Sequence, residues 1–401
     1  MKKSGFYIYF IYYAVFFAAM SVYNTFMTIY FGSVGCTPSQ IGTISAAGPL
    51  ATIAGQYIFG RISDILPPRG KNILIFALYT ASAALLLLYR SSGAFVYLIV
   101  ISMLYTFFNA PEQQLSDALS LDYSAASGCR YSIIRMGGTI GYAIMAAAAG
   151  AVIAASGDSG MFACVTALTL LSGVLSLFLP RAAHTGNETA NQCSTREKVS
   201  YFSLFRDKRL TLILLLNFLI YICISFYISF FPVYLKQAAG GDSSVVGRVM
   251  FALVLCEVPF LLFAQRIEKR FGTDKILIVS CFAMALRWGI YASTRSIPLL
   301  AAASALHGLS NITTLYCSVS FIQRSADVRL RATGQTTLGI VNYGLARIVG
   351  NFAGGFISEK AGIPAMFAIC SVIAFAAGVI YIIGIKYLNR RYPPKTPDCQ
   401  Q

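Results

Sequence analysis

Apolar residues along the chain are grouped in long blocks, and short polar or charged stretches separate these blocks. Each block holds about 18 to 25 residues, enough for a helix to cross the ~30 Å hydrocarbon core of a bilayer. The alternating segments of ~10 residues that form a membrane barrel are absent. The pattern predicts an all-α polytopic membrane protein with twelve transmembrane helices, at roughly 6–31, 41–59, 73–90, 94–116, 133–156, 160–179, 210–235, 245–264, 276–293, 297–321, 333–356 and 364–387.

Composition supports the same class of protein. Of the 401 residues, 57% are hydrophobic and 11% are charged, whereas soluble domains have ~45–50% apolar and ~25% charged residues. A soluble multidomain enzyme is excluded. The first block follows Lys2 and Lys3, as in a signal peptide, but its apolar run is too long and no cleavage signature follows, so it is interpreted as a helix.

A membrane enzyme is also disfavoured, because it would need a nucleophile with a base or a metal cluster. The chain has two histidines, His184 and His307, and its carboxylates are not clustered. The ten cysteines occur singly with no CxxC pair, which is typical of helix-packing residues. We expect no catalytic residues, no metal and no cofactor.

The positive charges indicate how the chain is oriented. Most of the 31 Lys and Arg residues fall in loops on the side of the two termini. Because such loops stay in the cytoplasm, we expect both termini to be cytoplasmic and the protein to be a multi-pass protein of the cell (inner or plasma) membrane. The net charge of +16 then reflects topology, and nucleic-acid binding is unnecessary to explain it.

One long polar segment, Pro180 to Arg209, divides the spans six and six. We therefore expect an N-terminal half (1–180), a cytoplasmic central loop (181–209), a C-terminal half (210–388) and a cytoplasmic tail (389–401). The halves also resemble each other: Gly60 to Lys71 between spans two and three is echoed about 200 residues later by Arg266 to Lys275. Many transporters have such a repeat, with substrate bound where the halves meet.

The loop after span two resembles the most recognisable motif of the major facilitator superfamily. It contains Gly60, Asp64, Arg69 and Lys71, although Pro67 and Pro68 displace the Arg-Gly-Lys run and the second copy has lost its acid. The resemblance implies a gating latch in which Asp64 faces a neighbouring helix N-terminus, where the helix dipole favours a carboxylate. The alternative is an ordinary charged turn that orients the protein.

Ionisable residues within spans cost about 2.5–3.5 kcal/mol on insertion scales, so they usually face a cavity and have a partner. On span five, Arg135, Thr139 and Tyr142 share one helix face. This face offers a guanidinium, a hydroxyl and a ring, which suits a polyhydroxylated sugar. Asp117 on span four is the expected partner of Arg135. The informative residues are Glu112, Asp117, Arg135, Glu257, Arg287, His307 and Arg347.

This region resembles the lactose-permease-like oligosaccharide–proton symporters. Asp117 and Arg135 are 18 residues apart, as are an acid and an Arg in that family, and the run Arg135 to Tyr142 resembles the family's Arg-Met-x-Gly-x-x-Gly-Trp. The resemblance implies that Asp117 and Arg135 bind sugar hydroxyls and that Tyr142 stacks on the ring. Asp replaces the family's Glu and Tyr its Trp, and a structural ion pair between spans four and five is the alternative. Glu112 has no assigned role.

In the second half, Glu257, Arg287 and His307 are each about 10–12 residues into their spans, near the bilayer midplane. A carboxylate, a guanidinium and an imidazole at one depth can store or pass a proton, and the family couples protons to sugar with residues at these places. The departures are Ser310, where the family has a second acid, and span seven, which lacks its acids. Structural roles for Glu257 and His307 are the alternatives, and Arg347 is a candidate partner for Glu257.

The sequence therefore predicts a proton-coupled symporter for a lactose-like disaccharide or glycoside, acting by alternating access as a monomer. Its expected partners are a small-molecule substrate, protons and membrane lipid. The second half also resembles the phenylpropionate-type permeases at Glu257-Val258, Arg287-Trp288-Gly289-Ile290 and Leu306-His307. The alternative is therefore an aromatic-acid permease, with Arg135 or Arg287 holding the carboxylate, or a nucleoside permease. A drug exporter is disfavoured because span five has no proline. The absence of a GxxxxGK[ST] motif leaves an ion gradient as the driver.

Overall fold

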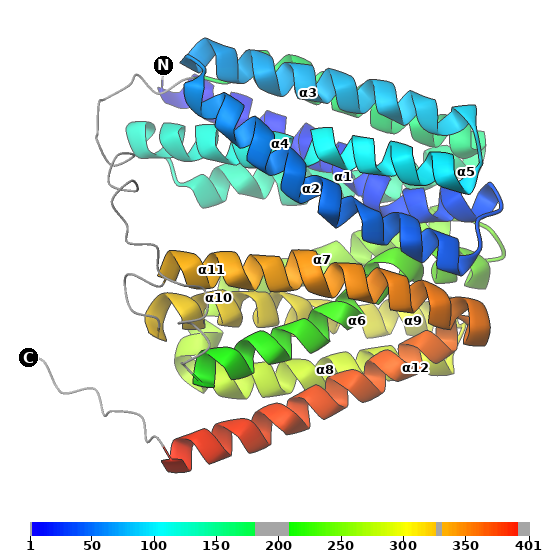
Figure 1. Ribbon diagram of the computed structural model, residues 1–401, viewed down its shortest axis with the longest axis vertical. Coiled ribbons are helices and arrows are strands. Elements are labelled where there is room, and N and C mark those ends of the chain that lie inside the picture. The colour runs from blue at the N-terminus through cyan, green and yellow to red at the C-terminus, as the bar shows by residue number, and fades with distance from the viewer. Residues whose placement is uncertain (1, 181–207, 326–330, 392–401) are drawn as a thin grey trace, which may run out of the picture.

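The computed structural model describes residues 2–180, 208–325 and 331–391, and every regular element in these ranges is helical (Figure 1). Most of the predicted central loop, including His184, and most of the predicted tail lie outside the described residues.

The N-terminal half contains five long helices. They are α1 (Lys2–Ser33), α2 (Pro38–Ile65), α3 (Pro68–Leu88), α4 (Phe95–Ser127) and α5 (Tyr131–Leu177), with a short 3-10 turn η1 (Tyr89–Ser91) after α3. Gly157 interrupts α5 with φ 62° and ψ −153°, a conformation that glycine adopts without steric cost. The two parts of α5 correspond to predicted spans five and six.

The C-terminal half is less regular. Its helices are α6 (Lys208–Ala238), α7 (Ser243–Phe271), α8 (Thr273–Ser293), α9 (Ile297–Ser304), α10 (Thr313–Ser325), α11 (Arg331–Gly339) and α12 (Ala346–Arg391), with π-helical segments η4 (Gly308–Ile312) and η5 (Ile340–Leu345). Gly362, with φ 83°, divides α12 as Gly157 divides α5. Predicted span ten therefore corresponds to α9, η4 and α10 together.

Eight helices in the described ranges are long and apolar enough to cross a membrane. Two of them contain the interrupting glycines and so make two crossings each, and α2 and the α9–α10 run provide the other crossings. The predicted twelve spans are thus present in the all-α fold. Asp117, expected near the end of span four, lies well inside α4, because that helix continues to Ser127.

Glycines allow α5 to approach α1 closely. A Cβ added to Gly137 would lie 2.5 Å from the carbonyl oxygen of Phe10, and one added to Gly141 would lie 2.0 Å from that of Ala14. No larger residue fits such contacts without movement of the backbone. These glycines therefore let α5 pack closely on α1.

The two halves meet at the end of the bundle opposite Lys2 and Arg391, the right-hand end in Figure 1. A Cβ on Gly42 of α2 would lie 2.8 Å from the Cα of Gly355 in α12, and a Cβ on Gly150 of α5 would lie 2.9 Å from the Cα of Gly247 in α7. Helices from different halves are therefore in backbone contact at two places. We call this region the closed end.

Polar contacts reinforce the closed end. Helix α2 begins with a capping box formed by Thr37 and Gln40, and the backbone N–H of Ser39 donates to Oε2 of Glu359 in α12 at 2.9 Å. The Asn351 amide donates to the carbonyl oxygen of Ser45 at 3.0 Å. Both bonds join the halves.

Candidate substrate and proton sites

Asp117 lies at the centre of a polar cluster in the N-terminal half. Its Oδ1 accepts hydrogen bonds from the hydroxyl of Tyr13 at 2.6 Å and from that of Tyr131 at 3.0 Å. Nη1 of Arg135 lies 3.5 Å from the same oxygen. The predicted pairing of Asp117 with Arg135 is thus present in the structure, but the two phenols make the shorter contacts.

The Arg135 guanidinium also packs on aromatic rings of α1. Its Cζ lies 4.3 Å from the ring centroid of Phe17 and 5.4 Å from that of Tyr13, within the range of cation–π attraction. The Asp117 and Arg135 side chains remain 26% and 31% exposed. An ion pair inside a helix bundle that keeps this exposure can be reached by a solute.

Sequence reasoning missed Tyr13, Phe17 and Tyr131. A signal was available for each of them. Tyr13 and Phe17 are four residues apart on the first span, as are Tyr131 and Arg135 on the fifth, and residues at this spacing share a helix face. Which face of the first span meets Arg135 depends on the tertiary packing of α1 on α5.

Thr139 and Tyr142 extend the face of Arg135 toward the interior, and both are half-buried. The seven helical steps from Arg135 to Tyr142 cover ~10 Å of helix axis, about the length of a disaccharide. The Tyr142 hydroxyl lies within electrostatic range of the Glu257 carboxyl in the other half. The two predicted sites are therefore neighbours across the interface.

Glu257, His307 and Arg287 form one connected chain. Oε1 of Glu257 lies 2.6 Å from Nε2 of His307, and Nδ1 of His307 is hydrogen-bonded to Nη1 of Arg287. A neutral imidazole satisfies both contacts when its Nε2–H donates to the carboxylate and its Nδ1 accepts from the guanidinium. The chain brings together the three residues predicted for proton coupling.

A glycine and a π-helical segment position His307. It directly precedes η4, and a Cβ on Gly308 would lie 2.5 Å from the carbonyl oxygen of Cys256. Because Gly308 has no side chain, the tenth span approaches α7 at the residue next to Glu257. Single π-helical turns often occur at functional sites.

Arg287 is enclosed by aromatic side chains. It is fully buried, with its Cζ 4.9 Å from the ring centroid of Tyr227 and 5.5 Å from that of Trp288. Within the described residues, its Nε and Nη2, the Tyr227 hydroxyl and the Trp288 indole nitrogen have no hydrogen-bond partner. Buried polar groups of this kind are usually bonded by ordered water.

Two other intramembrane charges, Arg347 and Glu112, lie outside these clusters. Arg347 is not the ion-pair partner of Glu257, since Glu257 pairs with His307. The electrostatic neighbours of Arg347 are the phenols of Tyr343 and Tyr23. Glu112 is fully buried and accepts from the Ser82 hydroxyl at 2.6 Å and the Asn109 amide at 2.9 Å.

The loop after α2 has an unexpected local structure. Pro67 is the N-cap of α3 and Pro68 its first residue, so Arg69, Gly70 and Lys71 lie in the first turn of a helix. Gly60 has no neighbour that a side chain would meet, and Asp64 is exposed and in no ion pair with a described residue. The latch stays a prediction.

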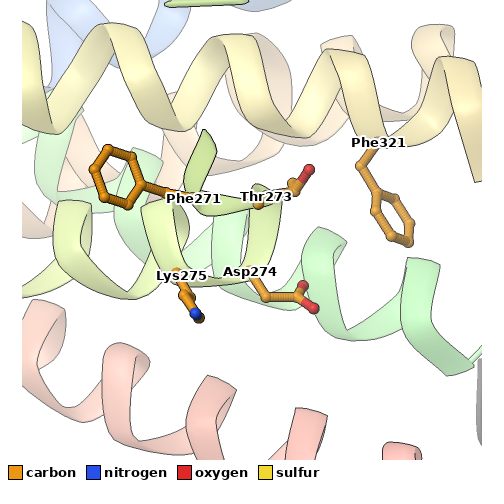
Figure 2. A pocket seen from close by; sticks show the side chains of 6 residues that line it. Phe271, Thr273, Asp274, Lys275 and Phe321 are labelled. Carbon is orange, nitrogen blue, oxygen red and sulfur yellow. The ribbon is translucent and has the colours of Figure 1, made fainter. Parts of the chain in front are cut away.

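The second copy of this loop retains a carboxylate, contrary to expectation. Glu268 is 2% exposed and accepts hydrogen bonds from the hydroxyls of Ser320 at 2.8 Å and Thr273 at 2.9 Å. Gly272, with φ 80°, makes the turn into α8. A pocket of about 300 Å³ lies beside this turn, lined by Phe271, Gly272, Thr273, Asp274, Lys275 and Phe321. Figure 2 shows its lining side chains. None of these residues belongs to the polar clusters of Asp117 or Glu257, so this cavity is not the candidate substrate site.

A twelve-span helical fold with charged clusters beside the interface of its halves defines a membrane transporter. The chain belongs to the MFS_1 like family, whose sequence model matches residues 6–369. It is 24% identical to the maltose permease of Geobacillus stearothermophilus over 90% of each chain. It is 26% identical to the probable 3-phenylpropionic acid transporter of Escherichia coli, over 74% of this chain and 76% of that protein.

A solved structure shares the fold. The crystal structure of the nucleoside transporter NupG superimposes with a TM-score of 0.81 at 16% identity, covering 96% of this chain and 99% of that one. The predicted architecture is confirmed, and the relatives are transporters, not enzymes.

Proposed function

We propose that the protein is a proton-coupled symporter that moves a sugar, a disaccharide or glycoside, across the cell membrane with its termini in the cytoplasm. In this proposal Asp117, Arg135, Thr139 and Tyr142 bind the substrate, and Glu257, Arg287 and His307 carry and tune the proton. The maltose permease among the relatives agrees with this substrate class.

The observation that carries proton coupling is the chain from Glu257 through His307 to Arg287. The Glu257 carboxylate can take up a proton on its other oxygen while Oε1 keeps the hydrogen bond from His307. Glu257 is half-buried, whereas His307 is only 4% exposed, so a proton from the interface reaches Glu257 first. The Tyr142 hydroxyl, within electrostatic range of Glu257, couples protonation of Glu257 to the helix face that binds the substrate.

The substrate proposal depends on the accessible donors and acceptors around Asp117. Arg135 offers forked N–H donors, Asp117 offers acceptors, and Tyr142 offers a ring for the C–H face of a sugar. When a substrate hydroxyl replaces the 3.5 Å contact of Arg135 with Asp117, each charged group gains a closer partner.

The test is external pH in lightly buffered, de-energised vesicles that contain the protein. Maltose, lactose, a nucleoside and 3-phenylpropionate are added in turn, with protein-free vesicles as the control for passive permeation. We expect alkalinisation on addition of a sugar. Sugar exchange without a pH change would contradict proton coupling, and a response to 3-phenylpropionate alone would replace the sugar by an aromatic acid.

The second candidate function is transport of an aromatic carboxylic acid or a nucleoside. It is favoured by the match to the probable 3-phenylpropionic acid transporter and by the aromatic surroundings of Arg287. Arg287 is fully buried, so it is less able than Arg135 to hold the carboxylate in this conformation.

A further inference from the structure

Arg347 lies at the middle of the eleventh membrane crossing. It is 16 residues after the start of α11 and 15 residues before the kink at Gly362, about 22–24 Å from either end at 1.5 Å per residue. It follows the π-helical segment η5 by two positions. The other π-helical segment, η4, directly follows His307, so each irregular turn adjoins a charged or titratable residue.

The side chain of Arg347 is directed toward the interface between the halves. One helical turn further along α12, Asn351 bonds the Ser45 carbonyl of α2 and the Ser229 hydroxyl of α6. Residues four apart share a helix face. Arg347 also lies within electrostatic range of the Tyr23 hydroxyl of α1, which places it opposite the N-terminal half rather than against lipid.

Arg347 differs from the other intramembrane cations in having no acidic partner. Arg135 pairs with Asp117, and His307 joins Arg287 to Glu257. Among the described residues no carboxylate lies within ion-pair distance of Arg347, whose electrostatic neighbours are two phenols. A guanidinium stays protonated, and an intramembrane charge without a partner is costly. The interface therefore has one uncompensated positive charge.

Arg347 is less enclosed than Arg287. The residue is half-buried, whereas Arg287 is fully buried and two of its guanidinium nitrogens have no partner among the described residues. Opposite Arg347, the ring of Tyr23 stacks on that of Tyr105 at 4.3 Å between centroids. A planar forked donor with aromatic rings beside it suits a carboxylate on a ring-containing molecule.

We propose that Arg347 binds a carboxylate of the transported substrate, so that the protein selects an acidic glycoside over its neutral counterpart. This inference rests on the proposed transport function and narrows its substrate class. One guanidinium matches the single charge of a carboxylate. Uptake of one carboxylate with one proton also adds no net charge to the loaded transporter, which avoids the cost of moving a charge through the membrane.

The experiment measures binding of matched probes to the purified full-length protein by titration calorimetry. The first pair is p-nitrophenyl β-D-glucuronide and p-nitrophenyl β-D-glucoside, which differ only in a carboxylate against a hydroxymethyl group. The second pair is 3-phenylpropionate and 3-phenylpropanol. The variants are Arg347→Gln and Arg347→Lys, and Arg248→Gln removes the same charge from an exposed position on α7.

We expect the wild type to bind the acid of at least one pair about tenfold or more tightly than its neutral partner. Arg347→Gln should remove this preference and change the affinity for the neutral probe less than about twofold. Arg347→Lys should keep part of the preference, because lysine retains the charge but not the fork. Arg248→Gln should bind as the wild type does.

Three outcomes would overturn the inference: no preference for either acid in the wild type, an unchanged preference in Arg347→Gln, or equal loss of acid and neutral probe in that variant. If Arg347→Gln does not fold, an Arg347→Lys variant that matches the wild type for every probe overturns it. Failure of the sugar proposal has a different signature: neither glycoside binds the wild type, while 3-phenylpropionate binds and depends on Arg347.

Discussion

At the scale of single residues, the Asp117 carboxylate has three hydrogen-bond donors around one oxygen. Tyr13 and Tyr131 hold Asp117 at 2.6 and 3.0 Å, so Arg135 is left at 3.5 Å with donor capacity to spare. The phenols keep Asp117 in place even when Arg135 turns to a substrate. This arrangement favours Arg135 as the mobile, substrate-facing member of the cluster.

Arg135→Ala should therefore weaken substrate binding by about 10- to 100-fold, the range for loss of charge-assisted hydrogen bonds. Binding to the purified variant by calorimetry checks this. Arg130→Ala is the matched control, because Arg130 is exposed and lies just before α5. Affinity retained in Arg135→Ala would show that the substrate lies elsewhere.

Glu257→Gln should separate exchange from accumulation. The amide keeps the shape of the carboxylate but cannot take up a proton, so equilibrium exchange should continue while uptake against a gradient stops. Radiolabelled uptake in proteoliposomes with and without an imposed pH gradient measures both. Asp122→Asn, at an exposed position of α4, should behave as the wild type, and concentrative uptake by Glu257→Gln would place the proton site at another carboxyl.

At the scale of elements, the helix ends and irregular turns determine where charged groups lie. The η4 and η5 segments adjoin His307 and Arg347, and Pro67 and Pro68 place the basic residues of the loop after α2 in the first turn of α3. Outside the membrane, Asp242 caps α7 by accepting from the backbone N–H of Ser244 at 2.8 Å. The Ser244 hydroxyl also donates to Oδ2 of Asp242 at 2.8 Å. The hydrogen bonds from the Ser244 hydroxyl and backbone lower the pKa of the Asp242 carboxyl below its usual 3.8.

The Asp242 cap should give a pH-dependent contribution to stability. Because its pKa is lower in the folded state, the carboxylate stabilises the fold above the unfolded-state pKa, and this stabilisation is lost as the pH falls through the folded-state value. Asp242→Ala should thus have a lower melting temperature than the wild type at pH 7, and the difference should shrink below about pH 4. Thermal unfolding between pH 7 and 3 measures it. A difference that persists at pH 3 would contradict the role of the ionised cap.

At the scale of the whole molecule, two glycine contacts and two hydrogen bonds hold the closed end together. Gly42 meets Gly355, Gly150 meets Gly247, and both pairs join helices of different halves. Since Asp117 and Arg135 remain accessible while this end is closed, the conformation is open toward the end that carries the termini.

Gly42→Ala should shift the protein toward a conformation in which the closed end is open. The added methyl would lie 2.3 Å from the Asn351 carbonyl oxygen, and overpacking of this kind costs about 1–3 kcal/mol in the closed form only. Distances between spin labels at the closed-end termini of α2 and α7, in a cysteine-free background, should lengthen. Gly339→Ala is the control because nothing lies within 4 Å of Gly339. Unchanged distances would contradict the view that these glycine contacts hold the closed end shut.

The sequence was sufficient for the helical architecture and for part of the site. Apolar blocks of membrane-spanning length have no other stable structure in a bilayer, so the twelve spans followed from hydropathy alone. The pairing of Asp117 with Arg135 and the meeting of Glu257, Arg287 and His307 could be predicted, because buried charges need partners at the same depth.

Other features depended on the tertiary structure. Tyr13 of α1 can reach the cluster of Asp117 and Arg135 because Gly137 and Gly141 let α1 and α5 touch. Glu257 pairs with His307 rather than Arg347 because Gly308 brings the tenth span against α7. Depth along a span is a local property and can be read from the chain. Which face of a helix meets which neighbour depends on packing among all the helices, and only the folded molecule determines it.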